Sequence, residues 1–287
     1  MFYAIAAMFF WGSSVVASKY IYGNIDPMFV IQIRLVIGSI LIAPLFMRYV
    51  KRVPKAMWKQ MAGLIFLSYP MVFFLQFVGA AHTSAASAVT IMGTQPLWMA
   101  LINYLFFKQK LHMTDILLGL VALVGIIIIV SGEDNNGATL LGDLMVMLGA
   151  ICWVYSNRAA RDVMDKLTQS VYTSVSMVTG MMMNWPMLVF TQNWSPTFDH
   201  GTIAILLYLG VGCTWLATRW WNKGLSQVPP QLMSMIGTLE PVFGIMLAYM
   251  VLGEQLTPKL VIGIVTVLSA TMLSVHFSLE RRKLRRL

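Results

Sequence analysis

The sequence predicts an all-α membrane protein whose ten transmembrane helices form two inverted five-helix repeats, with both chain ends in the cytoplasm. Three observations lead to this prediction: apolar blocks of helix length, basic residues on one side, and similarity between the two halves. Of the 287 residues, 58% are hydrophobic and 11% are charged, and the mean hydropathy is +0.74. Soluble globular domains are far less apolar, so we expect the chain to lie in a membrane.

The apolar residues form ten blocks, each close to the roughly 20 residues with which a helix crosses about 30 Å of hydrocarbon. Short polar or basic breaks separate them. The first block has neither a charged start nor a small-residue cleavage site, so we interpret it as a span and not as a signal peptide. The expected spans are 2–22, 28–49, 57–79, 83–107, 113–131, 139–158, 169–191, 202–223, 229–252 and 257–278. They leave no room for a soluble domain.

The basic residues indicate the orientation, because Lys and Arg near span ends are retained in the cytoplasm. With the N-terminus inside, every Lys and Arg except Lys19, Arg34 and Lys259 falls in a cytoplasmic connection or in the C-terminal tail. The outer loop 131–137, SGEDNNG, is acidic. We therefore interpret the net charge of +9 as a mark of topology and of contact with anionic lipids, without a nucleic-acid partner.

The second half of the chain repeats features of the first. The motif GTQP at 93–96 resembles GTLEP at 237–241, and the segment around Trp11 resembles the segment around Trp153 at a similar separation. Because five is an odd number of spans, the second half enters the membrane inverted, and such pairs share a cavity near the midplane. The predicted repeats are residues 1–136 and residues 137–287, the second with a basic cytoplasmic tail.

Short motifs recur along the chain in a specific order. They are WGSS at 11–14 with Lys19, Arg34, TSAASA at 83–88 and Pro96, then WVYSNR at 153–158, WNKGL at 221–225, LEPV at 239–242, LGEQLT at 252–257 and Gly263. Together they resemble the EamA-type ten-span transporters of the drug/metabolite transporter (DMT) superfamily over essentially the whole chain. The resemblance implies alternating access to a central cavity lined mainly by spans 1, 3, 4, 6, 8 and 9. One departure is at the end of span 4, where the family often has a Glu and this chain has Gln109 and Lys110.

Glu240 lies near the middle of the expected span 229–252. A charged side chain at this depth costs on the order of 2.5–3.5 kcal/mol, so it needs a partner, water or a function. Two interpretations stay open: a protonatable coupling site or contact for a cationic group, and a structural carboxylate that hydrogen-bonds a neighbouring helix. Gln95 precedes Pro96 as Glu240 precedes Pro241, so only one repeat has an ionisable group at this place.

Two arginines are candidates for contact with an anionic group. Arg34, inside span 2, can pair with an acid or receive a carboxylate, and its match to the family pattern favours a structural charge. Arg219 shares a predicted helical face with Trp215 and Asn222, which gives a guanidinium flanked by an aromatic ring and an amide. That face can hold a carboxylate-bearing metabolite. The alternative is that Arg219 extends to cytoplasmic headgroups one turn from the span end.

Further polar and aromatic residues are predicted to line the cavity. Tyr69 and Gln76 share a face of span 3, and aromatic side chains with neighbouring polar groups suit a permissive pocket. The remaining candidates are Trp11 with Ser14, Trp98, and Trp153 with Asn157. Lys19 and Asp26, near the first outer loop, are candidates for gate charges or for interfacial anchors.

The sequence contains no motif of an enzyme. It has no zinc-type His/Cys cluster and no phosphate-binding Gly loop, and Cys152 and Cys213 lie in different spans, so neither a cofactor, a metal nor a disulfide is expected. We expect a secondary transporter in the cytoplasmic (inner) membrane of a bacterium. The favoured function is proton-coupled export of amino acids or related carboxylate-bearing metabolites. The alternatives are a multidrug or organic-cation exporter and a membrane scaffold or receptor.

Overall fold

Helices make up all the regular structure that the computed structural model describes, which covers residues 2–108, 112–131, 139–227 and 236–284. They are α1 (Phe2–Ile21), α2 (Pro27–Tyr49), α3 (Trp58–Phe66), α4 (Gly79–Ala81), α5 (Ala85–Met92), α6 (Gln95–Phe107), α7 (Met113–Ser131), α8 (Leu140–Lys166), α9 (Gln169–Asn184), α10 (His200–Leu207), α11 (Ala217–Gln227), α13 (Leu239–Leu252) and α14 (Pro258–Leu284). Short 3-10 segments cover Val50–Arg52, Lys55–Met57 and Trp185–Phe190. The prediction of an all-α chain is confirmed for these residues.

Some sequence predictions lie outside the described residues. They are Gln109 and Lys110 in the departure from the family pattern, the acidic loop from residue 132 onward, the first seven residues of the expected span 229–252, and Arg285 and Arg286 in the basic tail.

Among the described residues, seven helical stretches are long and apolar enough to cross a membrane. They are Phe2–Ile21, Pro27–Arg52, Lys55–Ala81, Ala85–Phe107, Leu140–Lys166, His200–Gly224 and Pro258–Phe277. The segments Met113–Ile129 and Leu239–Leu252 are apolar helices of shorter length. The chain is therefore a multi-pass helical membrane protein.

Two helices extend beyond the apolar blocks that predicted them. The block 139–158 becomes α8, which ends at Lys166, and the block 257–278 becomes α14, which ends at Leu284. Hydropathy detects only the part of a helix that suits hydrocarbon, whereas the backbone continues where the sequence favours helix. In α8 the extension includes an ion pair one turn apart, between Arg158 and Asp162 at 2.5 Å.

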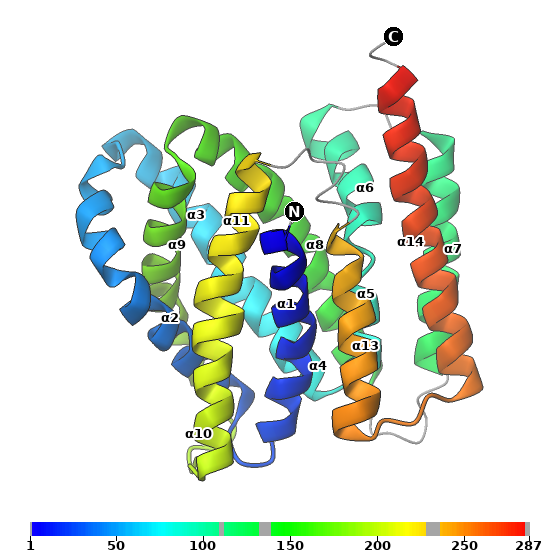
Figure 1. Ribbon diagram of the computed structural model, residues 1–287, viewed down its shortest axis with the longest axis horizontal. Coiled ribbons are helices and arrows are strands. Elements are labelled where there is room, and N and C mark those ends of the chain that lie inside the picture. Colours follow the sequence, from blue (N-terminus) through cyan, green and yellow to red (C-terminus); the bar gives the residue numbers. More distant parts are fainter. Residues whose placement is uncertain (1, 109–111, 132–138, 228–235, 285–287) are drawn as a thin grey trace.

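The helices run mainly lengthwise, from one end of the molecule to the other (Figure 1). Helix α1 lies in the middle, between α11 and α13, while α7 and α14 pack side by side at one edge. Helix α2 packs against α9 on the other side. Segments from the two halves of the chain are thus interleaved, and α1 contacts the second half along much of its length.

Helices in both halves depart from regular α geometry. The π-helical segments Leu67–Met71 and Phe74–Val78 join α3 to α4, and Tyr208–Leu216 joins α10 to α11. The helix formed by α5 and α6 is interrupted at Gly93 and Thr94, just before Pro96. The π-helical turns within α-helices frequently occur at functional sites.

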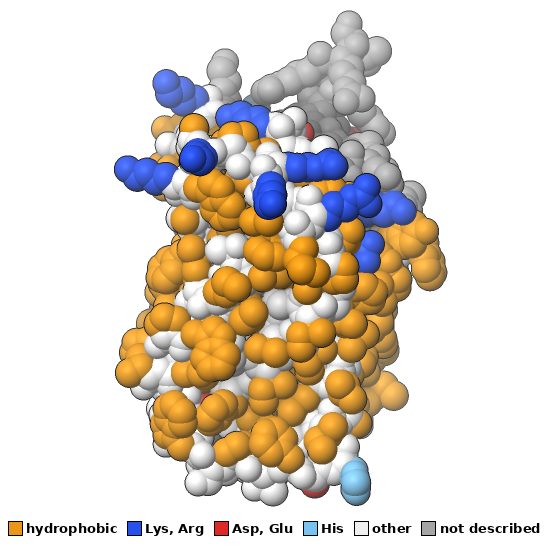
Figure 2. Space-filling model, turned by 90° about the vertical axis from the view of Figure 1, so that its left-hand side faces the viewer, with side chains coloured by type: hydrophobic (Ala, Val, Ile, Leu, Met, Phe, Trp, Pro, Cys, Tyr) orange, Lys and Arg blue, Asp and Glu red, His pale blue; other side chains and the backbone are white. Residues whose placement is uncertain are grey.

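Basic side chains gather at one end of the molecule. Figure 2 shows Lys and Arg side chains at the upper end of one face, above a broad hydrophobic band. The exposed residues of the connection from α2 to α3 belong to this end, among them Arg48, Lys51, Arg52, Lys55 and Lys59. The C-terminal end of α14 lies at the same end of the molecule (Figure 1).

Candidate functional site

A cavity lies among the central helices of the molecule. It is lined by side chains of α1, α2, α8 and α11, by the helical stretch 68–77, and by the start of α6 and of α13. The predicted site residues in its wall are Trp11, Ser14, Arg34, Tyr69, Gln76, Gln95, Trp153, Asn157, Asn222 and Glu240. Trp98, Trp215 and Arg219 are not among the lining residues.

Two tryptophans of the cavity wall, Trp11 and Trp153, pack together, and Trp221 supports Trp11 from outside the lining. The rings of Trp11 and Trp153 lie edge to face with centroids 5.3 Å apart, and the ring of Trp221 is also 5.3 Å from that of Trp11. The indole nitrogen of Trp11 donates to the carbonyl of Cys213 at 3.0 Å. Trp11 is therefore fixed between α8 and the helix of α10 and α11, and its ring forms part of a rigid aromatic wall.

Arg34 is a buried cation in the wall, with 2% of its surface exposed. Its Nε donates to the hydroxyl of Thr214 at 2.8 Å, and its guanidinium lies 4.7 Å from the ring centre of Phe77 and 5.3 Å from that of Phe73. Its Nη1 is buried and has no hydrogen-bond partner among the described residues. The sequence interpretation favoured a structural charge, and the structure places this charge at the cavity.

Glu240 also lines the cavity, with 8% of its surface exposed. Within the described ranges, no side chain or backbone group donates a hydrogen bond to its carboxylate. A Cβ atom on Gly12 would lie 2.5 Å from the carbonyl oxygen of Glu240 and 3.0 Å from the nitrogen of Gly244. The absence of a side chain at Gly12 thus allows α1 to touch the backbone of α13 at the level of this glutamate.

The three predicted residues outside the wall have local roles. Arg219 is exposed, and its guanidinium lies 5.2 Å from the ring centre of Trp215. The indole nitrogen of Trp98 donates to Thr94 at 3.0 Å, across the interruption between α5 and α6. Asn222, which was predicted to share a face with Arg219, instead points to the cavity side and donates to Thr173 at 2.8 Å.

Several lining residues were missed by the sequence interpretation. Phe73 and Phe77 follow Tyr69 by one and two turns, so helical spacing from Tyr69 was a usable signal for them. The same holds for Ser156 and Ala160 in relation to Trp153. Thr218 had the same signal, one turn before Asn222, whereas Tyr172 had none, because only the packing of distant segments brings it to the wall. The other missed residues are Val15, Ser68, Val72, Met92 and Cys213.

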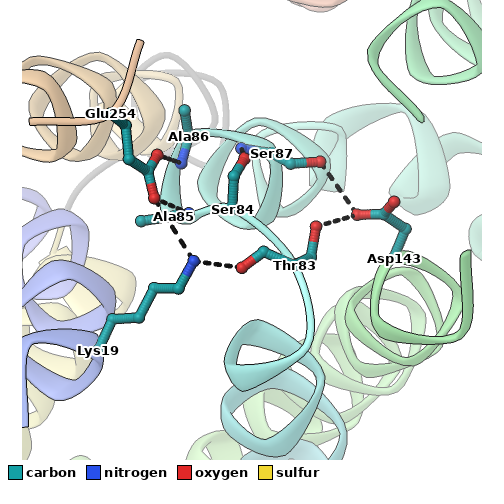
Figure 3. A network of polar contacts seen from close by, with 8 residues as sticks. All are labelled: Lys19, Thr83, Ser84, Ala85, Ala86, Ser87, Asp143 and Glu254. Atoms are coloured by element: carbon teal, nitrogen blue, oxygen red, sulfur yellow. Dashed lines mark hydrogen bonds and ion pairs between the residues drawn. The ribbon is translucent and has the colours of Figure 1, made fainter. Parts of the chain in front are cut away.

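A polar network around Glu254 joins α1, the start of α5 and the segment after α13 (Figure 3). Its carboxylate accepts hydrogen bonds from the backbone nitrogens of Ala85 and Ala86, at 2.7 and 3.0 Å, and pairs with Lys19 at 3.4 Å. Lys19 also donates to the carbonyl of Thr83. We call these five residues the Glu254 clamp. A carboxylate suits this place because the N-terminus of α5 presents free N–H groups and a positive dipole.

The clamp continues into α8 through Asp143. The carboxylate of Asp143 accepts from the hydroxyls of Thr83 and Ser87, at 2.7 and 3.0 Å (Figure 3). It thereby holds the start of α8 against the start of α5. Asp26, the other candidate gate charge, caps α2 through Met28 and accepts from the backbone of Gln192 and Asn193.

The clamp lies between the cavity and one end of the molecule. Lys19 follows the lining residue Ser14 by five residues along α1, which is about 7 Å at 1.5 Å per residue. Glu254 lies beyond the end of α13, whereas Glu240 is near its start. In the other direction the wall reaches Tyr172 in the first turn of α9. The clamp therefore lies between the cavity and one end of the molecule, and the lining residues extend from it toward the opposite end, where the basic residues gather.

Metal ligands do not cluster in the described residues: no group of three or more His, Cys, Asp or Glu side chains there is placed to hold an ion. Cys152 and Cys213 are free thiols, the first half-buried and the second buried.

Comparison with known proteins identifies the family. The model of the EamA-like transporter family matches residues 1–131 and 140–276. An uncharacterized transporter of Haemophilus influenzae is 38% identical over 141 residues, which are 47% of this chain and 83% of that protein. Protein PecM of Dickeya dadantii is 24% identical over 216 residues, which are 74% of this chain and 72% of that protein. A crystal structure with 17% sequence identity has the same fold, with a TM-score of 0.68 over 98% of this chain and 97% of the other.

The match covers nearly the whole chain, and the relatives are named as transporters, so the expectation of a non-enzymatic membrane transporter is confirmed. The protein belongs to the EamA-like transporter family.

Proposed function

We propose that the protein exports amino acids or related carboxylate-bearing metabolites across the cytoplasmic (inner) membrane of a bacterium by alternating access. The carrying observation is a central cavity that is lined by charged and amide side chains and has the Glu254 clamp between it and one end of the molecule. A cavity open toward one side and closed toward the other is the arrangement that alternating access requires.

The proposal includes ten spanning helices in two inverted repeats, 1–136 and 137–287, with both ends in the cytoplasm. Its support is the contact of Trp11 with Trp153, which occupy equivalent places in the two repeats. Further support comes from the π-helical segments in the third and eighth expected spans. The basic end of the molecule then faces the cytoplasm, and its contacts there include anionic lipids. In this orientation the clamp closes the outer side.

Glu240 is the proposed coupling residue. It is a buried carboxylate in the cavity wall, and no described hydrogen bond or ion pair occupies it. Gln95, at the equivalent place in the first repeat, lines the same cavity without a titratable group. A single carboxylate among the described lining residues provides a site where proton binding can alternate with substrate binding.

A second candidate function is the export of organic cations. It is favoured by the carboxylate of Glu240 and by the rings of Trp11 and Trp153 in the cavity wall, since aromatic faces attract cations. The buried guanidinium of Arg34 in the same wall opposes it, because like charges repel strongly where water is scarce. A scaffold or receptor without transport gains no support from relatives that are named as transporters.

Flux into proteoliposomes tests the proposal. Purified protein is reconstituted, and uptake of labelled amino acids, organic acids and organic cations is measured with and without an imposed pH gradient. Amino-acid flux that a pH gradient accelerates is the expected result. Flux of cations alone supports the second candidate, and the absence of flux for every class contradicts the proposal of metabolite export.

A further inference from the structure

Arg34 is a buried cation that has no counter-ion among the described residues. The ion pairs in these ranges join Lys19 to Glu254, Arg158 to Asp162 and His276 to Glu280, and none involves Arg34. Its Nη1 is left without a hydrogen bond although the side chain is almost completely buried. A charge in such a place is costly unless something neutralises it.

The neighbours of Arg34 fix its position without neutralising it. The hydroxyl of Thr214 accepts a hydrogen bond from Nε, and the rings of Phe73 and Phe77 lie close to the guanidinium. Rings and a hydroxyl orient a guanidinium and contribute a modest attraction, but they carry no negative charge. The side chain is therefore held in one orientation with part of its donor capacity unused.

The unused donor belongs to a side chain in the cavity wall, and Ser14 of α1 lies in the same wall with its buried hydroxyl near the thiol of Cys213. A guanidinium presents parallel N–H groups that match the two oxygens of a carboxylate. We propose that Arg34 and Ser14 form the carboxylate-binding subsite of this transporter. This inference rests on the proposed transport of carboxylate-bearing solutes.

The subsite lies toward the clamp end of the cavity. Arg34 is seven residues from the start of α2 at Pro27, about 10 Å along the helix, and Asp26 before it belongs to that end. Asn157, Asn222 and Tyr172 line the part that extends the other way. A solute therefore binds with its carboxylate directed toward the clamp and with its remaining groups toward the other end of the cavity.

Binding to the purified full-length protein in lipid nanodiscs tests the subsite. The probes are the proteinogenic L-amino acids, the amides of the amino acids that bind, simple carboxylates such as acetate, pyruvate and succinate, and sodium chloride as an inorganic anion. Dissociation constants are measured by calorimetry. An amino acid is expected to bind more tightly than its amide, which has the same side chain and ammonium group but no carboxylate.

Variants locate the subsite. Arg34→Gln is expected to raise the dissociation constant of the amino acid on the order of 10- to 100-fold, as for the loss of charge-assisted hydrogen bonds, and to leave that of the amide unchanged. Arg34→Lys, which keeps the charge but not the paired donors, should restore part of the affinity. Arg48→Gln, at an exposed arginine, is the matched control. Ser14→Ala tests the same subsite if the Arg34 variants do not fold, with a several-fold loss expected for the acid alone.

The outcomes separate this inference from the proposed function. If amino acids are transported and Arg34→Gln weakens acid and amide equally or not at all, the carboxylate subsite is wrong while the transport proposal stands. If Arg34 determines carboxylate binding but no flux is observed, the subsite stands and the transport proposal fails. Binding of chloride in preference to every carboxylate, or binding of no carboxylate, also overturns the subsite.

Discussion

At the residue scale, the role of Glu240 depends on the groups that contact its backbone and its carboxylate. Its backbone carbonyl is in close contact with α1 at Gly12, Pro241 follows it directly, and its carboxylate lies at the cavity. A carboxylate that stabilised the fold through hydrogen bonds would have donors around it, and the described residues provide none. This environment is consistent with the proposed coupling role, in which the carboxylate binds and releases a proton.

Substitution of Glu240 by Gln distinguishes coupling from structure. Gln has nearly the same shape as Glu, but its amide does not bind a proton near neutral pH. Amino-acid flux in proteoliposomes should therefore persist and lose its dependence on the pH gradient. Glu280→Gln, at an exposed glutamate of α14, is the matched control and should leave that dependence intact. An unchanged response to pH in the Glu240 variant would show that coupling occurs elsewhere.

At the element scale, the close packing of α1 against α13 depends on Gly12. A methyl group at this position would lie 2.5 Å from a backbone oxygen that has little freedom to move. Helices in membranes associate through such small residues, because lipid is as apolar as the side chains and the hydrophobic effect does not drive the helices together. Close packing of the backbones contributes the attraction instead. The position of Trp11 and Ser14 in the cavity wall follows from this contact.

Substitution of Gly12 by Ala should lower the stability of the protein. The expected cost is about 1–3 kcal/mol, as for other overpacked cores, because α1 and α13 must move apart. Gly63→Ala is the control: Gly63 is exposed in α3, no atom lies within 4 Å of an added methyl group, and alanine favours helix. Thermal unfolding in detergent should show a lower midpoint for Gly12→Ala and an unchanged or higher one for Gly63→Ala.

The Glu254 clamp connects elements of both halves, and its loss should loosen the end that it closes. Glu254→Gln removes the charge that pairs with Lys19 and one of the two acceptor oxygens at the start of α5. Hydrogen exchange at the amides of Ala85 and Ala86 should then become faster. Lys259→Gln, an exposed charge at the start of α14, should leave this exchange as it is. Equal protection in both variants would mean that the carboxylate does not hold the end closed.

At the scale of the whole molecule, the distribution of charge gives the two ends different surroundings. Exposed lysines and arginines gather at one end, and the clamp and the Asp26 contacts lie at the other. A cysteine in place of Lys55 should therefore be shielded from a membrane-impermeant maleimide in intact cells, and one in place of Asn193 should react. Reaction of the Lys55 position in intact cells would reverse the proposed orientation.

The helices were predictable from the sequence because each apolar block is long enough to be recognised without its neighbours. The cavity was predictable where regular α-helical spacing holds, as for Trp153 and Asn157 in α8. In α11 only Asn222 was predicted correctly, because the preceding π-helical segment takes more residues per turn. Cys213 and Thr218, five apart, line the cavity together, whereas the α-helical pairing of Trp215 with Arg219 points elsewhere. Contacts between residues far apart in the sequence, such as Lys19 with Glu254, cannot be predicted from the local spacing of residues.

A single carboxylate in the clamp has a consequence for the way its end can open. Glu254 accepts hydrogen bonds from two backbone amides of α5 and pairs with one lysine of α1. Motion of either helix alone therefore breaks only some contacts of the Glu254 clamp and leaves the others intact. A partial separation of the helices therefore loses contacts of the Glu254 clamp without opening a path for a solute. In the proposed transport cycle, the low-energy route is therefore one concerted release, so that this end would have two positions and would leak little while the other end is accessible.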